Sequence, residues 1–85
     1  MTINPYPYGN EYITGTYTGE IKKAKLYVND KYTGVVGGTF KSNNFTFYVK
    51  GRFKSTDKVE LEGLSGQDKI LVEKQQVEII TTKLN

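Results

Sequence analysis

Short segments in which apolar and polar residues alternate one by one constrain the fold of this chain more than any other feature. The clearest lies at residues 23–28 (KAKLYV), a second at residues 45–50 (FTFYVK) and a third at residues 58–63 (KVELEG). Successive side chains of a β-strand point to opposite faces of its sheet, so a period of two places the apolar residues on one face. These segments therefore predict short, half-buried strands.

The composition agrees with an all-β chain. Val, Ile, Thr, Tyr and Phe, which favour strands, make up 34 of the 85 residues, whereas Leu, Ala and Met together number seven. Turn-forming residues recur about every ten residues, a spacing typical of a β-sandwich or small barrel with six or seven strands. The length suits one such domain and is too short for two separate cores.

Asn29 and Asp30 lie between two strand-like segments and predict a two-residue hairpin turn, because both residue types tolerate a positive φ angle. Counting outward from this turn sets the register of the hairpin, with two tyrosines paired on its outer face. The expected cross-strand pairs are Val28 with Lys31, Tyr27 with Tyr32, Leu26 with Thr33, and Ala24 with Val35.

Other turn signals divide the rest of the chain. The glycines at 37–38 predict a bulge or bend, residues 41–44 a loop, and residues 65–68 a second hairpin turn. A last strand is expected over about 69–80. Because that strand is long, we expect a bulge or break near residues 75–76.

The ends of the chain are expected to differ from its middle. Proline alternates with tyrosine in residues 1–10, which are expected to be a linker or an edge strand leading into the module, since proline cannot donate to a ladder. Residues 11–81 are expected to form the single module. Residues 82–85 are expected to be a C-terminal tail or linker.

The apolar faces of these strands define the expected core. Phe53 stands alone between turn signals and is expected to close one end of the core. Gly15 and Gly63 are expected where packing is tight, whereas Glu60 and Glu62 are expected to face water. The expected core residues are Ile13, Leu26, Val28, Phe45, Phe47, Phe53, Val59, Leu61 and Val72.

The chain contains no Cys and no His. It therefore has no thiol nucleophile, no imidazole base, no zinc cluster and no disulfide. The acidic residues Asp57, Glu60, Glu62 and Asp68 do not follow the spacing of a calcium-binding loop. We expect no catalytic residue, no metal site and no cofactor, and we expect that the protein is not an enzyme.

Exposed tyrosines are the first candidate for a ligand surface. Tyr27, Tyr32 and Tyr48 could form an aromatic strip, and aromatic rings with polar tips suit a sugar-binding surface. The alternative is that the tyrosine pairs only stabilise the sheet, by about 0.2–1 kcal/mol each.

A basic stretch is the second candidate. Residues 41–58 carry five cations, Lys50 and Arg52 among them, interleaved with aromatic residues. Such a pattern is found in nucleic-acid binding, but the alternation points Phe45 and Phe47 into the core, so we do not expect nucleic acid as a partner. An anionic wall polymer or a glycan fits the stretch better. No apolar run approaches the roughly 20 residues of a membrane span, and no membrane insertion is expected.

Several turn and strand sequences together resemble a known family. These are residues 12–19 (YITGTYTG), 24–30 (AKLYVND), 53–61 (FKSTDKVEL) and 65–68 (SGQD). They resemble the bacterial immunoglobulin-like modules repeated in Gram-positive cell-surface proteins of the adhesin and internalin type. The resemblance implies an immunoglobulin-like β-sandwich of about seven short antiparallel strands. The Cys, Trp, Cys arrangement of antibody domains is absent, so the core must be held without a disulfide.

The resemblance also implies a role. It indicates a non-catalytic module of a larger bacterial surface or secreted protein, acting as a spacer or in adhesion, in the cell wall or outside the cell. Its partners would be neighbouring modules of the same chain, and a glycan or a host surface protein. One alternative is a carbohydrate-binding module appended to a secreted hydrolase, using the exposed tyrosines. A second is a small basic barrel that binds RNA.

Overall fold

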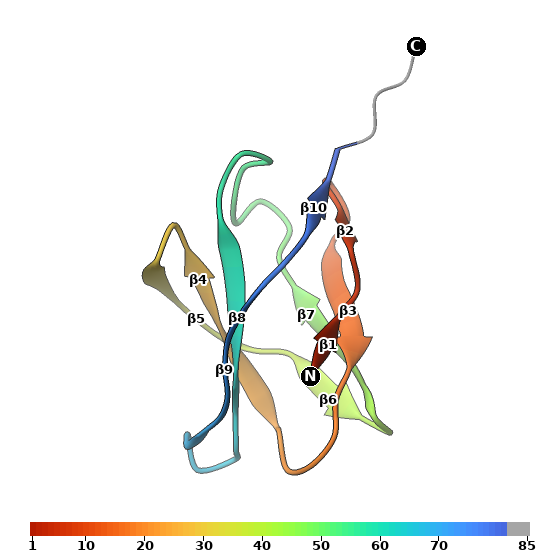
Figure 1. The fold of residues 1–85 in the computed structure, drawn as a ribbon, viewed down its shortest axis with the longest axis vertical. Helices are drawn as coiled ribbons and strands as arrows, with labels where there is room; N and C mark the ends of the chain where they lie inside the picture. The colour runs from red at the N-terminus through yellow and green to blue at the C-terminus, as the bar shows by residue number, and fades with distance from the viewer. Residues whose placement is uncertain (82–85) are drawn as a thin grey trace.

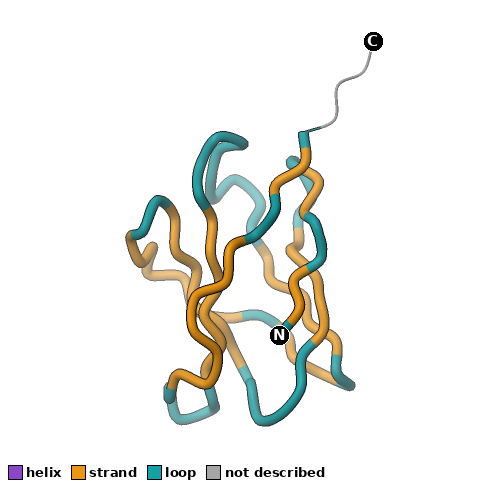
Figure 2. The backbone as a smooth tube through the Cα atoms, in the orientation of Figure 1, coloured by secondary structure: helices purple, strands orange, loops and turns teal. Residues whose placement is uncertain are grey.

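The protein was analysed as a computed structural model, which describes residues 1–81; the expected tail at 82–85 lies outside the described residues. The described part of the chain is built of strands joined by turns and loops (Figure 1, Figure 2). The strands are β1 (Thr2–Ile3), β2 (Tyr6–Pro7), β3 (Tyr12–Thr16), β4 (Lys23–Val28), β5 (Lys31–Gly37), β6 (Thr39–Lys41), β7 (Asn44–Tyr48), β8 (Val59–Leu64), β9 (Ile70–Gln76) and β10 (Ile79–Ile80).

Two four-stranded antiparallel sheets pack face to face. The first has the order β1-β3-β7-β6 and the second β5-β4-β8-β9, while β2 pairs with β10 in parallel. Three extended segments are each interrupted once and appear as two short strands: β1/β2, β5/β6 and β9/β10. Counted as single strands, they reduce the ten strands to about seven. Two sheets with this strand order form an immunoglobulin-like sandwich, and the predicted fold is confirmed.

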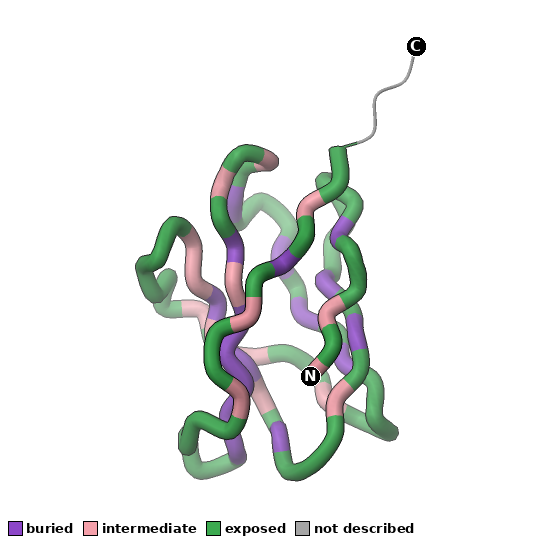
Figure 3. The backbone as a smooth tube through the Cα atoms, in the orientation of Figure 1, coloured by how far each residue is buried: buried purple, intermediate pink, exposed green. Residues whose placement is uncertain are grey.

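The core lies between the two sheets, on the inner faces that alternation selected (Figure 3). Seven of the nine expected core residues are buried; Val28 and Val72 are only half-buried. Phe53 closes one end of the core, as expected, with its ring centroid 5.4 Å from that of Tyr6. Buried apolar residues that the expected core left out are Tyr6, Ile21, Ala24, Val49, Leu64 and Val77.

The hairpin between β4 and β5 turns at Asn29 and Asp30, whose φ angles are 53° and 69°. Pairing beside the turn follows the prediction, with Tyr27 opposite Tyr32. Further along, the prediction is wrong, because Ala24 pairs with Gly37 and not with Val35. Gly34 has a φ of 87°, which only glycine adopts readily, and the extra residues it introduces into β5 shift the register.

The segment at residues 37–44 carries the chain from one sheet to the other. Gly38 has a φ of 98° and separates β5 from β6, so the predicted bend is present. The predicted loop at residues 41–44 is instead a tight hairpin. Ser42 and Asn43 take positive φ angles of 54° and 68°, and this two-residue turn lets Lys41 pair with Asn44.

Glu62 is not in water, contrary to the expectation from its charge. Its side chain lies on the outer face of the second sheet, yet the residue is only 7% exposed. The Tyr27 hydroxyl donates a hydrogen bond of 3.0 Å to its carboxylate oxygen Oε1. Burial, and then the bond to Glu62, raise the pKa of the Tyr27 hydroxyl above its ordinary value. A long tyrosine on the neighbouring strand thus covers the carboxylate.

Replacing Tyr27 with Phe is expected to lower the free energy of unfolding by about 1–2 kcal/mol, because a buried carboxylate then loses its donor. Replacing Tyr32 with Phe, on the adjacent strand, is the matched control and should change it by less than about 0.5 kcal/mol. Urea denaturation of both variants measures the difference. Equal effects would show that the hydroxyl of Tyr27 does not matter to Glu62.

Candidate functional site

The structure divides the five candidate ligand-binding residues, Tyr27, Tyr32, Tyr48, Lys50 and Arg52, into two groups. Tyr27 and Tyr32 lie on the outer face of the second sheet, on β4 and β5. Tyr48 lies on the outer face of the first sheet, on β7, and Lys50 and Arg52 follow it in the connection to β8. Tyr48 therefore faces the side of the sandwich opposite to Tyr27 and Tyr32, while Lys50 and Arg52 lie in a loop beyond the strand.

Lysines cover the first group. The rings of Tyr27 and Tyr32 lie 5.7 Å apart with a tilt of 44°. The Lys74 ammonium lies 4.8 Å from the centre of the Tyr27 ring, and that of Lys25 lies 5.0 Å from the Tyr32 ring. Such cation–π contacts occupy the ring faces that a sugar would need. This arrangement agrees better with stabilisation of the sheet than with stacking on a ligand.

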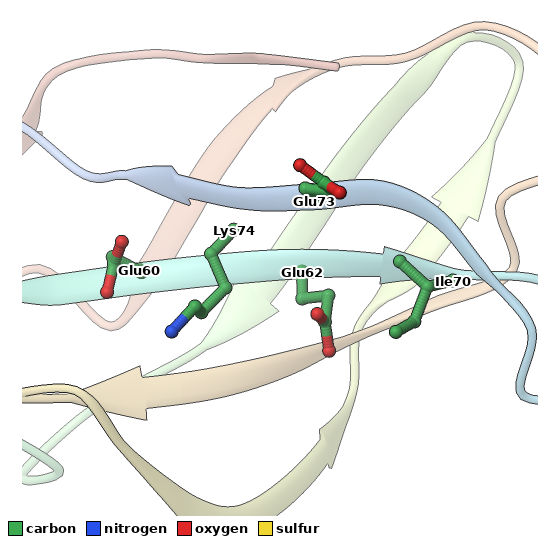
Figure 4. Close-up of a pocket in the computed structure, with 5 residues that line it drawn as sticks. All are labelled: Glu60, Glu62, Ile70, Glu73 and Lys74. Atoms are coloured by element: carbon green, nitrogen blue, oxygen red, sulfur yellow. The ribbon is translucent and has the colours of Figure 1, made fainter.

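A hollow of about 350 Å³ lies beside these tyrosines, over β8 and β9. Figure 4 shows Glu60 and Glu62 projecting from β8, with Lys74 between them and Glu73 directed away. Within the described residues, Oε1 of Glu60 is buried without a hydrogen-bond partner and lies 4.0 Å from the Lys58 ammonium. In that same part of the chain, acidic residues do not gather in threes that could hold a metal ion.

A second hollow lies at the end of the sandwich and is called the end pocket here. Its volume is about 290 Å³. Two loops form it, one following β2 and the other following β7. The residues that line it are Tyr6, Tyr8, Gly9, Asn10, Val49, Lys50, Gly51 and Phe53.

Three aromatic rings shape the end pocket. The Tyr8 ring lies 6.4 Å from that of Phe53, and its hydroxyl donates to the Phe53 carbonyl at 3.2 Å. The Tyr6 hydroxyl donates to the Asn10 carbonyl, and burial raises the pKa of this hydroxyl above its ordinary value. The Tyr6 side chain is therefore buried behind the pocket surface, whereas that of Tyr8 remains 46% exposed.

Of the second group of expected ligand residues, Lys50 lines this pocket, whereas Tyr48 and Arg52 do not. Lys50 is part of its lining, and its ammonium lies 3.7 Å from the Glu11 carboxylate. Next to it, the Tyr48 ring meets the ring of Tyr12 edge-on, with centroids 5.5 Å apart. Sequence reasoning included Lys50 but missed Tyr6 and Tyr8. Their signal was the alternation of proline and tyrosine in residues 1–10, which was interpreted only as a linker or an edge strand.

The fold and the surface together define a class of protein: a disulfide-free immunoglobulin-like module with small surface hollows. A comparison with protein families places it more closely. The family model described as "Bacterial Ig domain (Big_16)" matches residues 1–81, and the chain belongs to this family of bacterial immunoglobulin-like domains. Domains of this kind are generally non-catalytic modules of larger proteins.

The other comparisons add no relative. Searches of curated proteins and of solved structures found no significant match. Over residues 1–81, the structure shows no helix able to cross a membrane.

Proposed function

We propose that this chain is a load-bearing spacer module in a surface or secreted bacterial protein. The pairing of β2, near the start of the chain, with β10, the last of the described strands, carries the proposal. β2 and β10 run side by side in parallel, with Tyr6 opposite Ile79 and Pro7 opposite Ile80 (Figure 1). Two segments close to the start and the end of the described residues are thus joined directly, through backbone hydrogen bonds.

The parallel pairing of β2 with β10 determines how the module responds to a pulling force. The Tyr6 amide donates to the Glu78 carbonyl and the Tyr8 amide to the Ile80 carbonyl, both at 2.8 Å. When the two ends are pulled apart, two parallel strands must slide along one another, so these bonds are loaded together and not one after another. Simultaneous loading gives a high resistance to extension.

Packing adds to this resistance. Tyr6 is 3% exposed and Val77, just before β10, is 2% exposed. Sliding β2 past β10 would pull both side chains out of the core and expose apolar surface to water. Because the chain contains no Cys, its resistance to extension depends on these hydrogen bonds and on packing, without a disulfide.

Replacing Tyr8 with Pro is expected to lower the force at which the module unfolds when it is stretched through its two ends. Proline removes the amide that donates to Ile80, and it suits this position because Tyr8 is the second residue of a turn closed by the Asn10 amide on the Pro7 carbonyl. Tyr8→Ala is the matched control, because it also removes the ring but keeps the amide. Single-molecule force spectroscopy makes the comparison. The same unfolding force in both variants would contradict a load-bearing role for the pairing of β2 with β10.

The proposal extends to the setting of the module. Neighbouring modules of the same chain are its proposed partners, and the cell wall or the extracellular space its proposed location. Degradation of the protein by a protease added to intact cells would support that location, and full protection would contradict it. The alternative of a sugar-binding face on Tyr27 and Tyr32 is less favoured, because Lys74 and Lys25 cover the rings.

A further inference from the structure

We infer that the end pocket binds an acidic saccharide, that is, a sugar ring carrying a carboxylate. This site lies at the end of the sandwich, apart from the lysine-covered tyrosines on β4 and β5. It is also independent of the proposed spacer function, because its walls do not depend on whether β2 and β10 bear load.

The shape of the pocket suits a small ring. Gly9 and Gly51 lie at its rim with φ angles of 100° and 74°, which residues with side chains rarely adopt. A Cβ at either glycine would meet no atom of the described residues within 4 Å. The rim is therefore kept free of side chains by backbone conformation, and the mouth stays open. At about 290 Å³ the pocket lies at the lower limit for small-molecule sites.

The walls suit a sugar. The Tyr8 ring is 46% exposed and is available to a ligand, while the buried side chains of Phe53 and Val49 form the apolar floor behind it. Aromatic rings can pack on the C–H face of a sugar while polar groups at the rim bind its hydroxyls. Asn10 and Lys50 supply such groups here, the amide of Asn10 as donor and acceptor and the ammonium of Lys50 as donor.

The charge at the rim favours an acid. Lys50 lines the pocket, and Arg52 and Lys54 follow it in the same loop without lining the pocket themselves. The nearest acid on the other loop, Glu11, lies 3.7 Å from Lys50, but both side chains are more than half exposed. An exposed pair of this kind contributes little, so Lys50 can turn to a carboxylate on a ligand.

The test is a titration of the isotope-labelled protein, followed through its backbone amide resonances. The probes are trigalacturonic acid, the neutral sugar maltotriose and the acidic peptide triglutamate. We expect saturable shifts at residues 8–11 and 49–54 with trigalacturonic acid, and at least about tenfold weaker binding of the other two, because each lacks either the charge or the ring. Binding should weaken as salt is added, since it rests partly on the charge of Lys50.

Three variants locate the site. Lys50→Gln and Tyr8→Ala are each expected to weaken binding of trigalacturonic acid about tenfold or more, while Tyr32→Ala on the opposite sheet should leave it unchanged. A native-like spectrum of each variant shows that the fold is intact. The inference is overturned by an absence of saturable shifts, by equal binding of triglutamate or maltotriose, or by loss of binding in Tyr32→Ala. Since Tyr8→Ala keeps the amide that pairs with β10, loss of binding can be separated from loss of mechanical strength.

Discussion

Replacing Gly15 with Ala is expected to lower the free energy of unfolding by about 3 kcal/mol, at the upper end of the usual cost of overpacking. Gly15 lies in the middle of β3, between β1 and β7, opposite Ile3 and Phe45. A Cβ placed there would stand 2.5 Å from Cε1 of Phe45 and closer still to the carbonyl oxygen of Thr2. A backbone atom and a buried ring cannot both move away, so β1 would have to separate from the sheet.

Gly37→Ala is the matched control for this substitution. Gly37 is also in a strand, but a Cβ there would meet no described atom within 4 Å. Its φ angle is not positive, so alanine should be tolerated and should stabilise the protein by up to about 1 kcal/mol. Urea denaturation of the two variants gives the comparison. A similar stability for both would show that β1 yields without cost and that Gly15 is not needed for packing.

Replacing Phe47 with Ala is expected to lower the free energy of unfolding by about 3–5 kcal/mol, because it leaves a large cavity between the sheets. The Phe47 side chain is 1% exposed and belongs to the main core cluster. For a domain of this size each 1 kcal/mol corresponds to roughly 4–8 °C in melting temperature. Thermal denaturation followed by circular dichroism should therefore show a shift of well over 10 °C or a chain that is already unfolded.

The neighbouring residue provides the control. Tyr48 is 44% exposed and packs only edge-on against Tyr12, so Tyr48→Ala should cost no more than about 1 kcal/mol. The two substitutions remove rings of nearly equal size from adjacent positions of β7. Comparable losses at the two positions would mean that alternation does not assign the faces of this strand.

Local pattern predicted a large part of the fold because strand geometry is local. The inward direction of Phe45 and Phe47 follows from their spacing alone, and the turn at Asn29 and Asp30 follows from residues that tolerate positive φ angles. Phe53 was predicted to close the core because an isolated phenylalanine between turns has no other way to leave water. In each case the deciding forces act within a few residues of the chain.

The candidate site was only partly predictable. Lys50 and Arg52 were recognised by charge, but the end pocket brings Tyr8 together with Phe53, 45 positions further along the chain. Glu62 was expected to face water because of its charge. Its burial is explained by the Tyr27 side chain, which extends from the neighbouring strand and donates a hydrogen bond to its carboxylate. The alternating pattern therefore assigned these residues to the correct face of a strand, but contacts between strands determined whether their side chains are buried and which pocket they line.

The sequence by itself determined that the chain is all-β, where most of its turns lie and which side of each strand faces inward. The tertiary structure alone decided which sheet each strand joins. It placed Tyr48 and Tyr27 on opposite sides of the molecule, shifted the register of β5 at Gly34, and joined β2 to β10. The physical reason is that alternation reports only on the two faces of a single strand. Strand pairing is chosen by the burial and hydrogen bonding of the whole chain at once.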